Sequence, residues 1–561
     1  MEVREPQTVE AAAAGSAVGE TDRPHVLLSR RRRQVVTAGI LLGMFLAALE
    51  VTVVGTAMPT VIASLGGLNR YSWVFSAYLL TSTVTGPVWG RLSDQYGRRV
   101  LYLAGVVLFL LGSALSGMSQ SITQLIVFRA VQGLGAGGLI PLSLTINGDI
   151  YTMRERARIQ GLFSGVWGVA SMLGPLVGGF LTDQLSWRWV FYINIPFGIA
   201  AAVVVGMALA EPKIESRPVV DFAGAAWLSI GITLLLFVLV ESGSEGAWHN
   251  PLIIGSLAGI PLCAVLFVRA ERTAHEPIVP FSLFKNRVVT AGSISGVFVG
   301  MAMFGAISFI PLFIQGVLGG TATMAGTMLT PLLLSWVTMA VVGGRLMLKV
   351  GYRPTVLAGL SVLAVSFIAL SAVGINTPRW LLLANMAIMG SGMGLVVLAL
   401  LITTQSSVER RQLGIATSVN LFSRSIGGAI GVAVMGTIMT LGLTSHLKEI
   451  AERSGLPEAQ VYQVVHNPSA LIEPVSRSQL PAALISSMES GLADALHLVF
   501  VSGAVIAGLA LLSGFWLPSH FERPVVRSSA PDTLGELKEV PLRSANHVSD
   551  AKNPVGSARR V

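Results

Sequence analysis

The segment GRLSDQYGRR, residues 90–99, joins two long apolar runs and decides how this chain is built. A second segment, GRLMLKVGYR at residues 344–353, repeats its two glycines, its leucine and its first and last arginines in register. Glycines at these positions allow a tight turn between closely packed helices. A turn that recurs in register predicts two homologous halves of six helices each, related by an axis along the membrane normal.

The composition around these turns is that of a membrane protein. Of the 561 residues, 52% are apolar and 12% are charged, and the mean hydropathy is +0.70, whereas soluble domains carry about 25% charged residues. The net charge of +9 comes mainly from Lys and Arg in short loops, which indicates membrane topology rather than nucleic-acid binding. The single cysteine, Cys263, lies in an apolar run, where we expect it to pack.

Fourteen apolar runs are each long enough for a spanning helix, which needs about 20 residues. The first six, within residues 35–210, are expected to form one bundle, and the last six, within 288–517, a second. The two runs within 222–269 are an insert. We therefore predict an all-α membrane protein with fourteen transmembrane helices, two pseudo-symmetric six-helix bundles and two inserted helices. The runs are 35–65, 71–89, 100–118, 122–148, 159–182, 190–210, 222–242, 251–269, 288–318, 323–343, 354–374, 380–402, 413–443 and 492–517.

Basic residues alternate along the chain, since every connection predicted to lie inside is basic and the outer connections hold few Lys or Arg. This bias predicts a multi-pass protein of the cytoplasmic membrane with both termini cytoplasmic. Residues 1–34 are expected to form a retained cytoplasmic tail and residues 518–561 a disordered cytoplasmic one. The longest connection, residues 444–490, contains four prolines and is expected to form a small outer cap or an interfacial loop.

Glu50 carries a carboxylate inside the first apolar run. A charge near the bilayer centre costs about 2.5–3.5 kcal/mol on insertion scales, so such a residue is by default a functional-site hypothesis. The alternative is a structural glutamate that is protonated or hydrogen-bonded within the helix.

Arg129 lies in the fourth run beside a row of glycines that gives a smooth face for helix contact, and Met386 takes its place in the second half. At 1.5 Å per residue, Glu50 lies about 22 Å from the inner edge of its helix near Val35, and Arg129 lies about 12 Å from the outer end of its helix near Ser121. In a membrane about 30 Å thick both then lie at nearly the same depth and can pair. Burial favours the protonated carboxyl and a nearby guanidinium favours the carboxylate, so the pair can load and release a proton. The alternative is an arginine that snorkels to the outer surface.

Four segments carry a resemblance to a known family. Residues 90–99 resemble the signature G-x-L-a-D-r-x-G-r-r of the major facilitator superfamily. The glycines and proline within residues 165–179 look like the antiporter motif G-x-x-x-G-P-x-x-G-G. Residues 186–196, SWRWVFYINIP, resemble the W-R-W-x-F-x-I-N-x-P segment of its fourteen-helix drug:proton antiporters. Residues 49–59, LEVTVVGTAMP, resemble the family's L-D-x-T-I-V-N-x-A-L-P, with Glu50 in place of Asp and Gly55 in place of the usual amide. The resemblance covers about residues 35–517.

The resemblance implies roles for particular residues. Proton coupling falls to Glu50 and Arg129. The remaining expected sites are a conformational-switch loop of Gly90, Arg91, Asp94, Gly97, Arg98 and Arg99, an antiporter helix of Gly174, Pro175, Gly178 and Gly179, and cavity positions at Gln132, Asn420 and Arg424.

The expected function is proton-driven export of lipophilic small molecules, cationic drugs among them, by alternating access. We expect a monomer that is not an enzyme and that uses the proton gradient without a cofactor, and no phosphate-binding G-x-x-x-x-G-K-[ST] loop occurs. The same fold can instead export a lipid, a siderophore or an endogenous antibiotic, or import its substrate. A membrane enzyme and a non-transporting sensor are the alternatives from other classes.

Overall fold

The computed structural model describes residues 28–151, 153–209, 222–242, 249–274, 277, 279–409, 412–453 and 482–519. The elements described here belong to one compact unit, Met1–Arg523. Within these ranges the chain is helical, as predicted, and has no strand. The long helices are α2 (Arg30–Leu65), α3 (Tyr71–Tyr96), α4 (Arg98–Met118), α5 (Ile122–Ile150), α6 (Met153–Gln184), α8 (Asn194–Ala208), α9 (Phe222–Glu241), α10 (Pro251–Thr273), α11 (Arg287–Gly316), α12 (Ala322–Val350), α13 (Tyr352–Ser371), α14 (Arg379–Ser406), α15 (Leu413–Arg453) and α18 (Ala482–Phe515).

Among the described residues, 13 helical segments are long and apolar enough to cross a membrane. Helix α3 is the fourteenth long helix, and it is less apolar because serines and threonines are frequent in it. Several of their hydroxyls donate to the helix's own backbone, as Thr81 does to the Ala77 carbonyl at 2.9 Å and Thr85 to the Thr81 carbonyl at 2.7 Å. Helix α3 also packs against α5, α9 and α15, so it lies between other helices. The fourteen-helix prediction is confirmed.

Several boundaries differ from the predicted ones. The sixth span is divided at Ile193 into the short helix α7 (Trp189–Tyr192) and α8. Helices α15 and α18 reach into the predicted outer loop 444–490, because the apolar and small residues at its two ends continue the helical pattern. The first helix starts at Arg30, inside the predicted tail, since nothing between Arg30 and Val35 breaks a helix. The other parts of these loop and tail predictions, residues 1–27, 454–481 and 520–561, lie outside the described residues.

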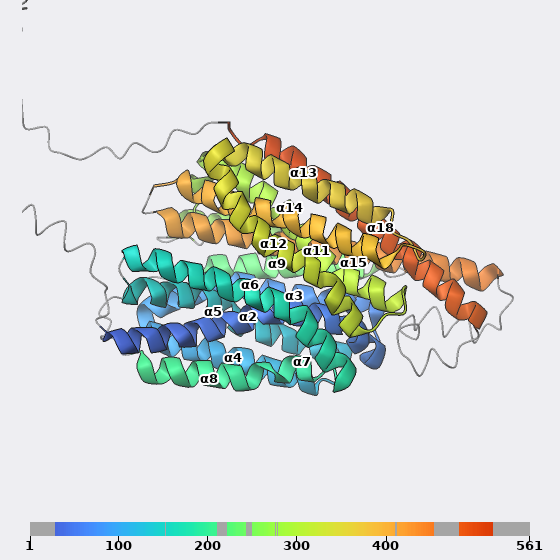
Figure 1. Ribbon diagram of the computed structural model, residues 1–561, viewed down its shortest axis with the longest axis horizontal. Helices are drawn as coiled ribbons and strands as arrows, with labels where there is room; N and C mark the ends of the chain where they lie inside the picture. Colours follow the sequence, from blue (N-terminus) through green and yellow to red (C-terminus); the bar gives the residue numbers. More distant parts are fainter. Residues whose placement is uncertain are drawn as a thin grey trace, which may run out of the picture. The chain divides into compact units, whose positions relative to one another are not determined.

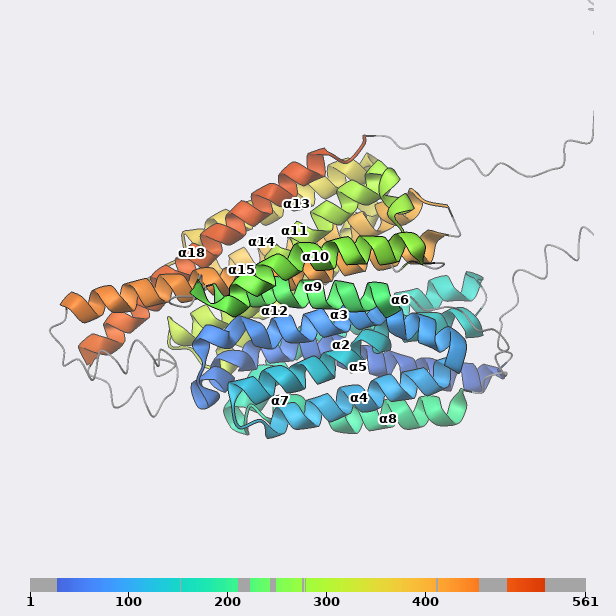
Figure 2. The same cartoon turned by 180° about the vertical axis from the view of Figure 1, so that it is seen from behind.

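The helices form an N-terminal bundle, α2 to α8, and a C-terminal bundle, α11 to α18 (Figure 1). We call the face where α2 begins the Arg30 side and the face where it ends the Leu65 side. The inserted helix α9 contacts α3 of one bundle and α15 of the other, and α10 packs on α9 (Figure 2). The insert therefore lies along one seam between the bundles.

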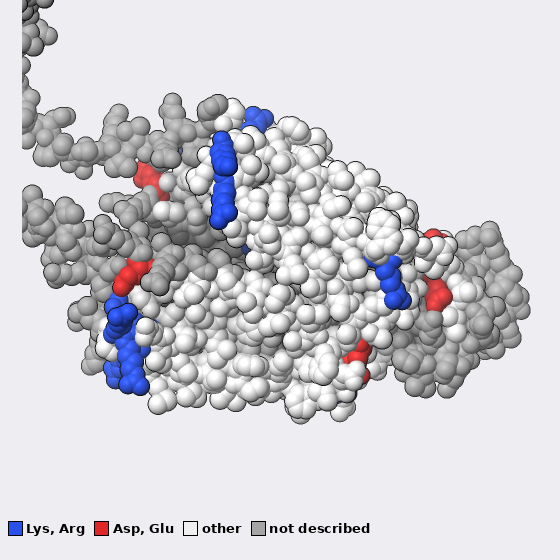
Figure 3. All heavy atoms as spheres, in the orientation of Figure 1, with Lys and Arg blue, Asp and Glu red and all other residues white. Residues whose placement is uncertain are grey.

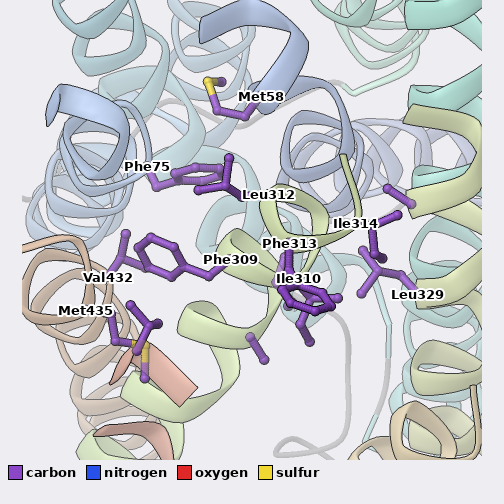
Figure 4. Packing of buried hydrophobic residues seen from close by; sticks show 14 of the residues in the cluster. Met58, Phe75, Phe309, Ile310, Leu312, Phe313, Ile314, Leu329, Val432 and Met435 are labelled. Carbon is purple, nitrogen blue, oxygen red and sulfur yellow. The ribbon is translucent and has the colours of Figure 1, made fainter. Parts of the chain in front are cut away.

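A single apolar core joins the two bundles on the Leu65 side. Met58 and Phe75 of the N-terminal bundle pack in one cluster with Phe309, Leu312 and Val432 of the C-terminal bundle (Figure 4). Phe309 is fully buried there. We call this cluster the joint core, and it closes the Leu65 side of the contact between the bundles.

Polar contacts reinforce this closure. The Asp183 carboxylate, near the end of α6, accepts the backbone N–H groups of Ala322 and Thr323 at the start of α12, at 3.2 and 2.8 Å. The Gln315 side-chain amide of α11 donates to the Thr56 carbonyl of α2 at 2.8 Å. Asp183 thus satisfies helix-terminal N–H groups of the opposite bundle.

On the Arg30 side the bundles have separate cores. Val36, Tyr102 and Ile146 belong to a cluster that the N-terminal bundle forms with α9. This cluster also includes Ala429 and Ala433, which lie near the middle of α15. Val356 and Leu400 belong to a different cluster, made by the C-terminal bundle alone. The space-filling view shows the surface hollowed between the bundles on this side (Figure 3). We call this space the interbundle gap.

Candidate functional site

The centre of the N-terminal bundle holds a buried ion pair between Glu50 of α2 and Arg129 of α5. Arg129 Nη1 donates to Glu50 Oε1. The side chain of Glu50 is 0% exposed and that of Arg129 is 2% exposed. Glu50 is buried because α2 packs against α5, α6, α8 and α11. Removing one partner of such a pair leaves an uncompensated buried charge, which costs about 3–5 kcal/mol.

Further groups hold the Arg129 guanidinium in place. Its Nη1 also donates to Gln132 Oε1 at 2.7 Å, one helical turn along α5. Its central carbon lies 4.2 Å from the ring centroid of Tyr78 and 5.8 Å from that of Phe191. A desolvated cation over an aromatic face gains about 2 kcal/mol. These contacts leave Arg129 deep in the bundle rather than snorkelling to a surface.

Asn194 binds the other carboxylate oxygen of Glu50. Its Nδ2 donates to Glu50 Oε2 at 2.6 Å and to Ser113 Oγ at 3.0 Å, and Ser113 Oγ donates to the Phe191 carbonyl at 2.8 Å. The break at Ile193 starts α8 at Asn194, so the amide reaches α2. Sequence reasoning missed Asn194 and Ser113. The available signal was the amide in the segment SWRWVFYINIP.

All these partners of Glu50 and Arg129 come from the N-terminal bundle. The opposite bundle meets α2 elsewhere, for example where Gly55 faces Ile307 of α11. The Glu50 carboxylate therefore lies away from the interbundle gap, and its charge acts on the packing of the N-terminal bundle.

The segment GRLSDQYGRR is mostly helix rather than loop. Helix α3 continues to Tyr96, because no residue before Gly97 breaks it, and Gly97 makes the turn with φ +96°. Gly351 makes the corresponding turn with φ +90°. Around Gly90 there is open space, so no close packing requires that glycine.

Arg98 anchors this segment on the Arg30 side. Its Nε donates to Asp149 Oδ2 of α5 at 3.1 Å and its Nη1 to Ser93 Oγ at 3.0 Å. Arg99 is exposed. The side chains of Arg91 and Asp94 lie outside the described residues, so their predicted switch role stays a prediction.

The predicted antiporter helix lies between the two bundles. A side chain at Gly174 or Gly178 of α6 would overlap Thr52 or Thr56 of α2, and one at Gly179 would overlap the backbone of Thr323 in α12. Helix α6 runs without interruption through Pro175, whose carbonyl touches Gly326 of α12. The small residues thus allow α6 to contact α2 and α12 at backbone distance.

The three predicted cavity residues lie in different places. Gln132 is 0% exposed and bonded to Arg129, so it belongs to the ion-pair network and not to the gap. Asn420 is buried on α15. Arg424 is part-buried on α15 where its backbone touches Gly300 of α11, and no acidic partner for it occurs among the described side chains.

The fold and this site define a class of protein, a multi-pass helical membrane transporter made of two bundles. The family model of the Major Facilitator Superfamily matches residues 40–432. The chain belongs to this superfamily.

Named relatives and solved structures agree with this assignment. The chain is 36% identical over 504 residues to the multidrug transporter protein MdtP of Bacillus subtilis, covering 87% of this chain and 93% of that protein. It is 34% identical over 479 residues to multidrug resistance protein 3 of the same species, covering 85% and 94%. A bacterial homologue of the human lysosomal transporter Spinster, solved inward-facing and unoccupied, has a TM-score of 0.62 at 18% identity, covering 87% and 98%. That likeness concerns the fold alone.

Proposed function

We propose that this protein is a proton-driven antiporter that exports lipophilic small molecules, cationic drugs among them, across the cytoplasmic membrane. The observation that carries the proposal is the buried Glu50–Arg129 pair. Placing an ionisable side chain so deep in a bilayer costs free energy, and such residues are by default functional-site hypotheses. The names of the multidrug relatives favour export of drugs. We propose a monomer as the working unit.

In the proposed cycle, protonation of Glu50 cancels the ion pair. Arg129 is then held by Gln132 and by the Tyr78 ring, and its charge is no longer balanced. The resulting change in packing within the N-terminal bundle shifts the balance between closure at the Leu65 side and closure at the Arg30 side. A proton that moves with the membrane potential supplies about 2.3 kcal/mol per 100 mV.

The interbundle gap is the proposed path of the cargo. On the orientation that the basic loops predict, the Arg30 side is cytoplasmic and the gap is open to cytoplasmic compounds. Its walls come from largely apolar helices, which suits lipophilic cargo. Arg424 is the candidate cation beside it.

The test is transport in proteoliposomes with an imposed proton gradient. Glu50→Gln should insert normally and lose proton-driven transport, because the amide cannot exchange a proton. Glu271→Gln is the matched control, since Glu271 is also a buried glutamate but accepts the Val279 N–H in another part of the chain. Full proton-driven transport by Glu50→Gln, with the control unchanged, would refute the proposal. A panel of dye, cation, lipid and siderophore cargo separates drug export from the other exporters.

A further inference from the structure

Three buried polar atoms beside the ion pair have no hydrogen-bond partner. They are Arg129 Nε, Gln132 Nε2 and Ser116 Oγ, on side chains that are 2%, 0% and 0% exposed. An unpaired buried donor or acceptor costs about 1–3 kcal/mol. Buried waters typically satisfy such groups, each making about three hydrogen bonds.

Helix register brings these three groups to one place. The backbone of Gln132 on α5 touches Gly112 on α4, where a Cβ would overlap it. Ser116 lies one turn beyond Gly112 on the same face of α4. Arg129 lies nearly one turn before Gln132 on α5, and because α5 runs antiparallel to α4, Arg129 faces Ser116. Three donors and acceptors thus surround one spot between α4 and α5.

The C-terminal bundle shows that helix packing alone does not require polar groups here. With Gly97 aligned on Gly351 and the two glycine rows aligned, the positions of Ser116, Arg129 and Gln132 fall on Leu370, Met386 and Met389. These three apolar side chains are 1%, 1% and 0% exposed. The corresponding contact between α13 and α14 has its own polar pair, Ser366 and Asn385, at other positions. Helix packing therefore does not require polar groups at the three positions of the trio.

The spot also lies close to the Leu65 surface. The Ser116 carbonyl accepts the Ser119 hydroxyl at 2.7 Å, and the Ser119 carbonyl accepts Arg188 Nη2 at 3.1 Å. The turn that follows exposes Gln120 and Gln124, which bond to each other. About one helical turn, roughly 5.4 Å, separates Ser116 from this polar turn.

We propose that Ser116 Oγ, Arg129 Nε and Gln132 Nε2 bind buried water that links the Glu50–Arg129 pair to the Leu65 surface. Protons reach the pair through this water, inside the N-terminal bundle, while the cargo uses the interbundle gap. The inference rests on the proposed proton coupling.

The test replaces the serine that lies between the pair and the surface. Ser116→Val removes the hydroxyl and fills the space of the water, and Ser116→Ala removes the hydroxyl alone. We expect proton uptake after acidification of the Leu65 side to slow about tenfold in the valine variant, less in the alanine variant, with cargo affinity unchanged. Ser366→Val is the control, because Ser366 is a buried serine that bonds Asn385 in the C-terminal bundle. It should leave the rate of proton uptake unchanged.

Two outcomes overturn the water site. One is proton uptake at the wild-type rate in a folded Ser116→Val variant while Glu50→Gln is inactive, which leaves the proposed function intact. The other is an experimental map, at a resolution that shows ordered water, without density among the three atoms. Normal proton-driven transport by Glu50→Gln would instead refute the proposed function itself, while the map still decides on the water.

Discussion

Glu50 is held by two partners of different kinds, a cation on Oε1 and a neutral amide on Oε2. The cation balances the charge, and the amide fixes the orientation of the carboxylate. Each oxygen accepts one donor and keeps a second lone pair. A proton that adds there removes the negative charge that both donors stabilise. This arrangement makes the strength of each donor a control on when the proton binds.

Asn194→Leu tests the contribution of the amide. A hydrogen bond to a charged group contributes about 1.5–3 kcal/mol. Its loss leaves the Glu50 carboxylate without a fixed orientation, so the rate of proton-driven exchange should fall about tenfold, equivalent to 1.36 kcal/mol. The measurement is the exchange rate per inserted molecule, with Asn385→Leu, a buried asparagine of the C-terminal bundle, as control. An unchanged rate would assign Asn194 to packing.

Arg424→Met tests whether this cation faces the cargo. On the proposal that Arg424 lines the gap, removing its positive charge should improve binding of cationic lipophilic compounds and weaken binding of anionic ones. We expect about a tenfold change in relative affinity, equivalent to 1.4 kcal/mol. Competition binding with a cationic and an anionic dye measures it. Arg188→Met, which removes a part-buried arginine on the Leu65 side, is the control. Equal ratios in wild type and Arg424→Met would exclude contact with charged cargo.

At the scale of elements, α6 is the part most constrained by both bundles. Its glycines touch α2 on one face and α12 on the other, and Asp183 at its end holds the first turn of α12. At these contacts the helices approach so closely that there is no room for a Cβ atom, and neither helix can move towards the other without a clash. A small change in the position of α6 is therefore felt by α2, which carries Glu50, and by α12.

Gly326→Ala tests this constraint. The added methyl group would overlap the Pro175 carbonyl of α6, and neither backbone can yield locally. Overpacking costs about 1–3 kcal/mol, so closure at the Leu65 side should become unfavourable and turnover should fall at least about tenfold. Transport rate per inserted molecule is the measurement. Gly165→Ala, in the open space along α6, should behave as wild type. Wild-type turnover in Gly326→Ala would show that this contact does not form during transport.

For the whole molecule, the joint core on one side and separate cores on the other predict a rocking motion. Spin labels at Tyr96 and Leu348, which are 66% and 86% exposed, report the Arg30 side. Labels at Leu185 and Thr327 report the Leu65 side. With Cys263 replaced by serine, pulsed electron resonance should show the first pair approaching and the second separating when Gly326→Ala is introduced. Distances that change together, or not at all, would contradict the rocking motion.

Much of this architecture was predictable from the sequence. Apolar runs and basic loops located the spans, and helix rise placed Glu50 and Arg129 at one depth. The rotation of each helix about its axis was not predictable, because it depends on packing among several helices. For this reason Gln132 was expected beside a cavity but lies in the ion-pair network. The contact from Asn194 depends on the break at Ile193. Asn194 and Pro196 are residues typical of a helix start, but only packing brings the Asn194 amide to α2.

The insert gives the two seams between the bundles unequal roles. Helix α9 covers the seam between α3 and α15, where the Thr437 hydroxyl donates to the Leu239 carbonyl. The seam between α6 and α12 is packed from Gly168 and Val337 towards the Leu65 side, but Leu162 and Val341, nearer the Arg30 side, are 50% and 57% exposed. On the proposed function, the seam between α6 and α12 is therefore the one through which a compound dissolved in the leaflet on the Arg30 side would reach the interbundle gap. Entry by this route would select compounds according to how they partition into lipid.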